Sequence, residues 1–284
     1  MSNEKRKVAG WSVLAAIFLT GFKFVVAILT GSLGLLSEAL HSGLDLVAAV
    51  ITYFSVRLSD KPPDKEHNFG HGKIENFSAL VETILLFVTC IWIIYEALNR
   101  LITGKTEIEV NIWSYIVVIS SIIIDISRSR ALSRVAKKYN SQALEADALH
   151  FSTDIWSSSV VLLGLICAQF GFFFADPVAA LVVAMIVFFI SYRLGKRSMD
   201  VLLDKAPRDA VKYIHATLSE FPEIIRFHNI KVRTAGADTF VKVNIHLKPD
   251  LSLQEVHEIC DRVEEKIKQK ISRCEVFVHP EPEN

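Results

Sequence analysis

The sequence lacks an excess of charge of either sign, because 31 lysines and arginines balance 31 aspartates and glutamates in 284 residues. Composition therefore gives no argument for binding nucleic acid, whose protein partners are typically basic. Paired cysteine spacing is also missing, since the four cysteines are scattered as Cys90, Cys167, Cys260 and Cys274. They are expected to be reduced bystanders in a protein that faces the cytoplasm.

Long apolar runs are what the sequence does have. Hydrophobic residues make up 51% of the chain and are concentrated before residue 200, while the remainder reads as a soluble domain. No small-residue cleavage site follows the first run, which is therefore predicted to be a retained helix rather than a signal peptide. Spans of about 20 apolar residues cross a bilayer, and six are predicted, at 9–30, 33–58, 77–98, 110–130, 144–170 and 177–199.

Basic residues predict the orientation of these spans. Those on one side are Lys5, Arg6, Lys7, Arg57, Lys61, Lys65, Lys73, Arg128, Arg130, Arg134, Lys137, Lys138, Arg193, Lys196 and Arg197. The connections on the other side carry only two. Because cytoplasmic loops are rich in lysine and arginine, both termini and the soluble domain are expected in the cytoplasm.

Two of the spans carry the same signature. One contains Glu-Ala-Leu-His41-x-x-x-Asp45 and the other contains Asp-Ala-Leu-His150-x-x-x-Asp154. Side chains four residues apart project from one face of a helix. The predicted orientation makes the two spans antiparallel, each in the middle of a three-helix half. This is the arrangement of an inverted repeat, whose shared site lies near the bilayer midplane.

His41, Asp45, His150 and Asp154 are therefore predicted to form a metal site in the membrane. An ionised side chain near the bilayer centre costs about 2.5–3.5 kcal/mol, and a divalent cation neutralises two carboxylates. Two imidazoles and two carboxylates suit a tetrahedral, zinc-like ion. A lone core histidine is more often hydrogen-bonded than metal-bound, so the matched second copy favours the metal. When the site is empty, protons can neutralise the two carboxylates instead of the metal, so metal and protons are expected to compete for the same groups.

Other charged residues in the spans are given smaller roles. Glu38 and Asp147, one turn before each histidine, either orient the imidazoles as acceptors or line a polar cavity entrance. Asp125 is expected to form an interfacial ion pair with Arg128 rather than to bind metal. Glu82 is expected only to line a cavity.

The chain resembles the cation diffusion facilitator family of divalent-metal transporters over nearly its whole length. The resemblance rests on the two His/Asp pairs, on the loop Asp64-Lys-Glu-His67-Asn-Phe-Gly-His71-Gly-Lys73 and on the histidine pattern of the soluble domain. It implies homodimers of six-helix subunits that export metal against protons and dimerise through cytoplasmic domains. The His/Asp pairing resembles zinc-type members, and the short basic connection between the fourth and fifth spans resembles prokaryotic ones, which places the protein in a cell (inner) membrane.

The loop after the second span holds a second predicted metal site, Asp64, His67 and His71. Their spacing aligns them if the segment coils, and two histidines with a carboxylate make an open zinc site. A solvated polar loop is the alternative. The resemblance implies the family's loop site, and delivery of metal to the membrane is one hypothesis for its role.

The soluble domain is predicted as helix 208–220, strands 227–234 and 239–248, helix 252–270 and strand 274–279. This αββαβ order predicts a small, metallochaperone-like α+β domain with its helices on one face of the sheet. Residues 1–204 are accordingly predicted as the transport domain and 205–284 as the metal-binding and dimerisation domain. Histidines from neighbouring strands converge, so a regulatory site is predicted from His228, His246, His279 and Glu281, with His257 as a bridging partner. Solvated histidines are the alternative.

Lys73 and Asp204 lie at the start of the third span and the end of the sixth. The resemblance makes them candidates for interlocking salt bridges at the waist of the dimer. Two unpaired interfacial charges are the alternative.

The predicted function is a secondary transporter that exports Zn²⁺ from the cytoplasm in exchange for protons. Cd²⁺, Co²⁺, Fe²⁺ and Mn²⁺ remain alternatives, because ligand type limits but does not fix the metal. A membrane-bound metal sensor or scaffold is the second hypothesis, although a sensor has no need of intramembrane aspartates. An intramembrane metalloprotease is not indicated, because the chain lacks a His-Glu-x-x-His helix; the protein is predicted not to be an enzyme.

Overall fold

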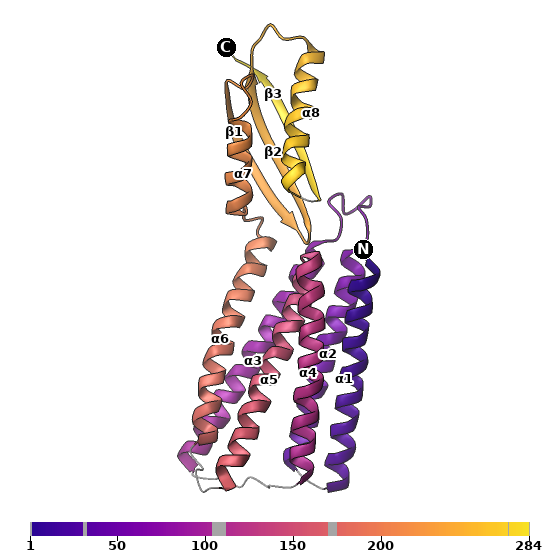
Figure 1. Ribbon diagram of the computed structural model, residues 1–284, viewed down its shortest axis with the longest axis vertical. Coiled ribbons are helices and arrows are strands. Elements are labelled where there is room, and N and C mark those ends of the chain that lie inside the picture. The colour runs from indigo at the N-terminus through magenta and orange to yellow at the C-terminus, as the bar shows by residue number, and fades with distance from the viewer. Residues whose placement is uncertain (1, 31–32, 104–111, 170–174, 272, 284) are drawn as a thin grey trace. The chain divides into compact units, whose positions relative to one another are not determined.

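The computed structural model describes residues 2–30, 33–103, 112–169, 175–271 and 273–283. The chain divides into two compact units: unit 1 is Met1–Lys61 with Ile74–Ser198, and unit 2 is Pro62–Lys73 with Met199–Asn284. Six long helices are followed by a three-stranded sheet with two further helices (Figure 1). The predicted fold class, a helical membrane protein with a small α+β domain, is confirmed.

The long helices are α1 Ser2–Thr30, α2 Leu33–Ser59, α3 Lys73–Thr103, α4 Ile112–Tyr139, α5 Gln142–Gln169 and α6 Ala175–Leu202. Each has 27 to 31 residues, about 40–46 Å at about 1.5 Å per residue, which exceeds the roughly 30 Å hydrocarbon core. In the described residues, α1, α2 and α3 are also apolar enough to be membrane spans on length and composition alone. The spans in α4 and α5 are interrupted by the charged residues described below.

The six helices of unit 1 alternate in direction. Ion pairs join the starts of odd-numbered helices to the ends of even-numbered ones: Lys5–Asp60 at 2.7 Å, Glu4–Lys138 at 2.6 Å and Glu145–Arg197 at 2.8 Å. This end of the bundle therefore holds Lys5, Lys138 and Arg197, which the sequence assigns to the cytoplasmic side.

Helices α1, α2, α4 and α5 share one apolar core, in which small residues such as Ala9, Ala16 and Ala49 are almost fully buried. Small side chains let helix backbones approach closely in a membrane. Helices α3 and α6 pack together beside this core, where the rings of Phe87 and Phe188 lie 5.2 Å apart. Four of the helices thus enclose the His/Asp motifs.

Helix α4 is longer than the sequence predicts. It continues nine residues past the predicted end at 130, to Tyr139, and only Asn140 and Ser141 separate it from α5. Asn140 adopts a left-handed conformation with φ of 50°, which asparagine tolerates better than most residues. The basic run is therefore helical rather than a connecting loop, because Leu132, Val135 and Ala136 within it pack into the core shared with α1, α2 and α5.

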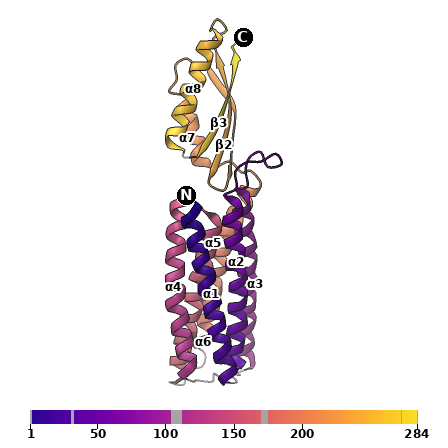
Figure 2. The same ribbon diagram turned by 90° about the vertical axis from the view of Figure 1, so that its right-hand side faces the viewer.

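Unit 2 contains α7 Arg208–Leu218, β1 Arg226–Ala235, β2 Asp238–Leu247, α8 Leu253–Lys270 and β3 Cys274–Pro282. The sheet order is β1-β2-β3; β1 and β2 pair antiparallel, and β2 and β3 pair parallel with α8 as the crossover. Both helices cover the same face of the sheet (Figure 2). A capping box between Ser252 and Glu255 starts α8.

The two faces of this sheet have different chemistry. Val241, Val243 and Ile245 of β2 are buried in the core shared with the helices, so the alternating residues Asn244 and His246 project from the opposite face. Strand β3 extends to Pro282, beyond the predicted end at 279, and its pairing with β2 continues through Leu247. This extension carries the third strand past the last predicted histidine.

Candidate metal sites

The membrane group lies midway along two antiparallel helices. Asp45 is the thirteenth of the 27 residues of α2, and Asp154 is the thirteenth of the 28 residues of α5. Because the helices run in opposite directions, these two midpoints lie at the same level of the bundle. His41 and His150 sit one turn before them on the same faces.

All four side chains converge. The His150 Nε2 atom lies 3.0 Å from an oxygen of Asp45 and 3.8 Å from one of Asp154, and His41 Nε2 lies 3.9 Å from each aspartate. Ligand atoms of His41, Asp45 and Asp154 all fall within 4.8 Å of one another. The side chain of His150 is 5% exposed and those of the aspartates 12% and 13%, whereas His41 is 37% exposed. The donors are therefore sheltered and have one open side.

A cavity of about 40 Å³ adjoins this group and is larger than a single water requires. Its wall includes three of the four residues together with Lys23 of α1 and with Asp125 and Arg128 of α4. The Lys23 ammonium donates a hydrogen bond to Ser42 Oγ at 2.8 Å. Two cationic side chains thus stand in the wall of a cavity that also holds three aspartates.

Arg128 joins three helices behind this cavity. Its guanidinium lies 3.3 Å from Asp125, donates to Ser12 Oγ at 3.1 Å and stacks 3.4 Å above the ring of Phe151. Asp125 and Arg128 are only 6% and 7% exposed, and α4 continues eleven residues beyond the arginine. The predicted ion pair exists, but it is internal rather than interfacial. The prediction placed it near the end of the helix because it ended that helix at residue 130, whereas α4 runs to Tyr139.

Asp147 does not orient the imidazole of His150 through a recorded hydrogen bond. It is fully buried, accepts from Ser12 Oγ at 3.3 Å, and its Oδ1 atom has no hydrogen-bond partner in the described structure. The His150 Nδ1 atom is likewise buried without a partner there. The side chain of Glu38 lies outside the described residues.

Glu82 is not part of the cavity wall. It is fully buried in α3 and accepts hydrogen bonds from Thr52 of α2 and from Ser78, the latter at 3.5 Å. The expectation that it lines a cavity does not hold for the cavity at the His/Asp group.

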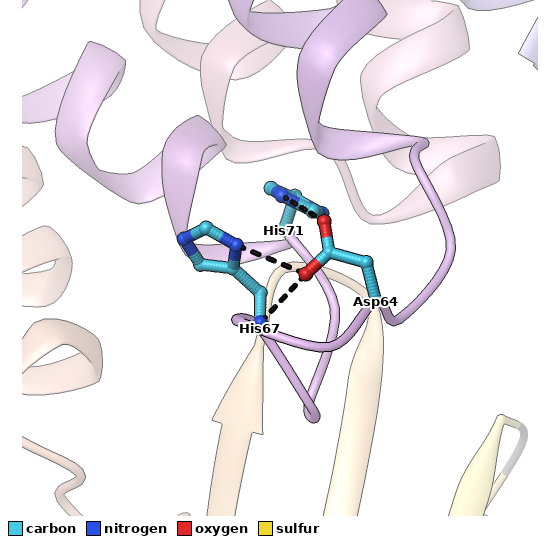
Figure 3. A group of neighbouring side chains, drawn as sticks. All are labelled: Asp64, His67 and His71. Carbon is cyan, nitrogen blue, oxygen red and sulfur yellow. Dashed lines mark hydrogen bonds and ion pairs between the residues drawn. The ribbon is translucent and has the colours of Figure 1, made fainter.

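The loop group is compact and belongs to unit 2 (Figure 3). Asp64 lies between the two imidazoles, 3.2 Å from His67 Nδ1 and 3.5 Å from His71 Nε2, and the ring centroids are 4.4 Å apart. Hydrogen bonds from the backbone N–H groups of His67 and Glu66 hold the pKa of Asp64 below its usual range. The carboxylate is thus kept ionised and ready to bind a cation.

The same loop packs on the β1–β2 hairpin. A Cβ atom at Gly72 would overlap the carbonyl oxygen of Ala235, so only glycine allows this approach. Arg233 stacks 3.9 Å over Phe69, and that ring meets Phe240 edge-on at 5.1 Å. The loop is therefore fixed to the sheet of unit 2 by packing as well as by its own turns.

Lys73 and Asp204 meet at the edge of this loop. Their side chains lie 2.8 Å apart, and Lys73 also donates to the carbonyl of Leu202 at 3.3 Å. Arg233 approaches the other oxygen of Asp204 to 3.7 Å. The two charges form an ion pair within one chain.

The C-terminal group lies on the sheet face opposite the helices. His246 Nε2 is 3.3 Å from His228 Nδ1 and 3.1 Å from Glu281, and His228 is 3.7 Å from Glu281. The register places His246 beside Glu281 and His228 beside Asn244. The Asn244 amide donates to Glu281 at 2.6 Å, and this bond, with the nearby histidines, lowers the pKa of Glu281.

The two remaining histidines lie at the margin of this group or away from it. His279 Nε2 is 3.8 Å from Glu281 but is not among the residues whose ligand atoms cluster. His257 is on α8, 73% exposed and 3.4 Å from Asp261. Within one chain the structure brings together His228, His246 and Glu281, and leaves His257 outside.

Sequence reasoning missed Lys23 and placed Arg128 at the wrong depth. The signal for Lys23 was present, because a lone lysine inside an apolar span indicates an intramembrane function or pairing. No comparable signal shows from sequence which helix faces such a lysine.

Two family models match the chain. The cation efflux transmembrane domain covers residues 11–203, and the cytoplasmic domain of cation efflux proteins covers residues 206–283. The cation-efflux pump FieF of Shewanella oneidensis is 28% identical over 272 residues, 95% of this chain and 92% of the relative. An uncharacterized transporter of Synechocystis sp. is 31% identical over 281 residues, 98% of this chain and 90% of the relative. The metal-bound C-terminal domain of the CzcD transporter from Thermotoga maritima is 25% identical, with a TM-score of 0.25, over 26% of this chain and 87% of that domain.

Proposed function

We propose, for a chain that belongs to the cation efflux family, that the cation exported is Zn²⁺ and that protons return in exchange. The observation that carries the proposal is the convergence of His41, Asp45, His150 and Asp154 at the middle of the bundle. Two nitrogen and two oxygen donors suit Zn²⁺ and also accept Cd²⁺, Co²⁺, Fe²⁺ or Mn²⁺. Mid-membrane placement between antiparallel helices is typical of transporter sites.

Charge balance supports proton exchange. A bound divalent ion cancels the charges of Asp45 and Asp154, whereas the empty group leaves them uncompensated in a region of low dielectric. Protons restore neutrality when the metal leaves. Metal and protons then occupy the group by turns, and rocking of one helix set against the other exposes it to each side of the membrane.

The other two groups are proposed to regulate or feed the transport site. Asp64, His67 and His71 would collect metal at the loop. His228, His246, His279 and Glu281 would bind regulatory metal, with the partner chain of a homodimer approaching through His257. Residues 1–204 would form the transport domain and 205–284 the metal-binding and dimerisation domain, both termini lying in the cytoplasm beneath an inner membrane. Lys73 and Asp204 would interlock at the dimer waist.

Zinc flux into proteoliposomes tests the proposal. Purified protein is compared with and without an imposed pH gradient, beside Asp154→Ala and, as a matched control, Asp261→Ala on the exposed face of α8. We expect the gradient to drive zinc movement in the wild type and in Asp261→Ala, and the flux to vanish in Asp154→Ala.

A membrane-bound metal sensor or scaffold is the second candidate, because the C-terminal group is open at the surface, with His228 51% exposed. Zinc binding without flux by correctly inserted wild-type protein would exclude the exchanger and support the sensor. Flux that survives in Asp154→Ala would keep transport but remove the membrane group as its site.

A further inference from the structure

Glu82 is a buried acid in which only one of the two carboxyl oxygens has a hydrogen-bond partner in the described structure. It lies a third of the way along α3, with no exposed surface. One oxygen accepts from Thr52 and Ser78, and the other, Oε2, is buried without a hydrogen-bond partner in the described structure. No ion pair is recorded for it among the described residues. Its recorded partners are neutral hydroxyl groups, and neither belongs to the proposed ligand set.

A carboxylate in this position is poorly stabilised. Burying an ionised group without a counterion is far less favourable than burying the neutral acid, and acids inside membrane spans are rarely retained without a function. Hydrogen bonds from two hydroxyl groups satisfy one oxygen of either form. The neutral acid can carry its proton on Oε2, the oxygen that has no hydrogen-bond partner in the described structure.

Glu82 is linked electrostatically to two side chains of α5. The charged groups that act on Glu82 are Asp147 and His150, both on α5. Asp147 Oδ1 and His150 Nδ1 are buried without hydrogen-bond partners in the described part of the chain. The other ring nitrogen of His150 faces Asp45 at 3.0 Å. Buried polar atoms of this kind are normally satisfied by a shared proton or by water.

Glu82 differs from the other buried acids around the site. Asp125 pairs with Arg128, Asp45 and Asp154 face the two histidines, and Asp147 accepts from Ser12. The cavity beside the metal group has Asp45, Asp125 and Asp154 in its wall together with two fixed cations, Lys23 and Arg128, and Glu82 lies outside that wall. Glu82 has neither a fixed cation nor a metal-binding role.

We propose that Glu82 is a proton-binding residue of the transport cycle, protonated while the membrane site is empty and deprotonated when metal occupies it. This inference rests on the proposed exchange of metal for protons. When a divalent cation enters, the Glu82 O–H bond breaks, the electron pair stays on the carboxylate, and the proton passes to water. Coupling is reciprocal, so a proton on Glu82 weakens metal binding by the same factor by which metal weakens the proton.

Glu82→Gln tests this with little change of shape. Glutamine keeps an acceptor for Thr52 and Ser78 but cannot release a proton. Full-length protein carrying His71→Ala and His246→Ala, which removes the other two groups, is titrated with Zn²⁺ by calorimetry in buffers of different ionisation heat. The control is Glu75→Gln, a buried acid on the same helix that is held by Lys5 at 3.0 Å.

We expect fewer protons released per zinc in E82Q, by up to one, and a flatter pH dependence of zinc affinity. E75Q should match its parent, and E82D should restore proton release. An unchanged proton count and pH dependence in E82Q would overturn the inference.

A second measurement covers the case in which E82Q does not bind zinc. The zinc-induced infrared difference spectrum of the wild type should then show loss of a protonated-carboxyl band that shifts in E82D, and a spectrum without such a band would overturn the inference. The two proposals fail separately. Absence of gradient-driven flux in the wild type with a lowered proton count in E82Q removes the antiporter but keeps Glu82. Gradient-driven flux in the wild type with no effect of E82Q keeps the antiporter but removes Glu82 as its proton-binding residue.

Discussion

The membrane group of unit 1 and the C-terminal group of unit 2 use the same kinds of donor in opposite surroundings. In the membrane group, each histidine is matched to an aspartate one turn away on the same helix. In the C-terminal group, each donor comes from a different strand and is positioned by strand register. The first sits beside a cavity with fixed cations in its wall, and the second lies on an open sheet face.

The difference teaches how one donor set serves two purposes. The fixed cations Lys23 and Arg128 beside the membrane group repel a bound divalent ion, and protons compete with that ion for the carboxylates. The C-terminal group lies on an open sheet face, where the side chains of His228 and His279 are about half exposed while that of His246 is 9% exposed. An ion is therefore expected to leave the first group readily and to remain on the second for longer.

His150→Ala should produce the largest effect, since His150 is the most buried donor and touches both aspartates. Changes in residues that merely support ligands cost about 10–100-fold, so loss of this ligand should cost about 100-fold or more in zinc transport. Proteoliposome flux measures it, with the exposed His215→Ala as control. Normal flux in His150→Ala would show that the membrane group is not the transport site.

His246→Ala should weaken the C-terminal group more than His279→Ala does. The side chain of His246 is 9% exposed and lies between two other donors, whereas that of His279 is 52% exposed. We expect losses of about 100-fold and about 10-fold in zinc affinity, measured by titration of full-length protein carrying Asp154→Ala. Equal losses of zinc affinity would mean that His279 binds the metal as directly as His246, and would contradict the ligand set His228, His246 and Glu281.

Gly72→Ala should loosen the loop group without touching a ligand. The added methyl group meets the backbone of Ala235, and overpacking of this kind costs about 1–3 kcal/mol. Faster proteolytic cleavage within residues 62–73 and roughly tenfold weaker zinc binding at the loop are expected, 1.4 kcal/mol being about tenfold. Gly21→Ala is the control, because no other group of the described residues lies within 4 Å of its Cβ position. Unchanged cleavage would contradict the docked loop.

Asn244→Ala should give the smallest effect, a rise in the pKa of Glu281. The Asn244 amide is the largest contributor to the lowered value. A carboxylate with a lowered pKa adds stability above its ordinary pKa and loses it as the pH falls through the lowered one. In the variant this contribution to stability should be smaller, and its loss should be complete at a higher pH. An NMR titration of the Glu281 carboxyl carbon in metal-free protein measures the shift, and an unmoved midpoint would assign the lowering to the histidines.

Most of the fold follows from local patterns in the sequence. Apolar runs locate the six long helices, and alternation in residues 240–247 locates β2, because these signals depend only on neighbouring residues. The ends are less predictable. Helix α4 runs through a polar, basic segment to Tyr139, and β3 runs through Pro280 to Pro282, because packing against other elements sustains both.

The membrane group was predictable because its two halves are copies of one helical spacing. The wall around it was not, since the approach of Lys23 and Arg128 depends on which helices meet. At the C-terminal group, the sequence indicated His228, His246 and Glu281, but the Asn244 contact arises only from strand register. Whether any of these groups binds metal stays a prediction.

The division of the chain has a mechanical consequence. The polypeptide passes between the two units three times, after Lys61, after Lys73 and after Ser198. A domain joined by one connecting segment can rotate about that segment, whereas three connecting segments restrict such rotation. The Lys73–Asp204 ion pair joins the chain at the second crossing to the chain just after the third. A change that moves this ion pair would therefore act on the first residue of α3 and on the residues just after α6 together.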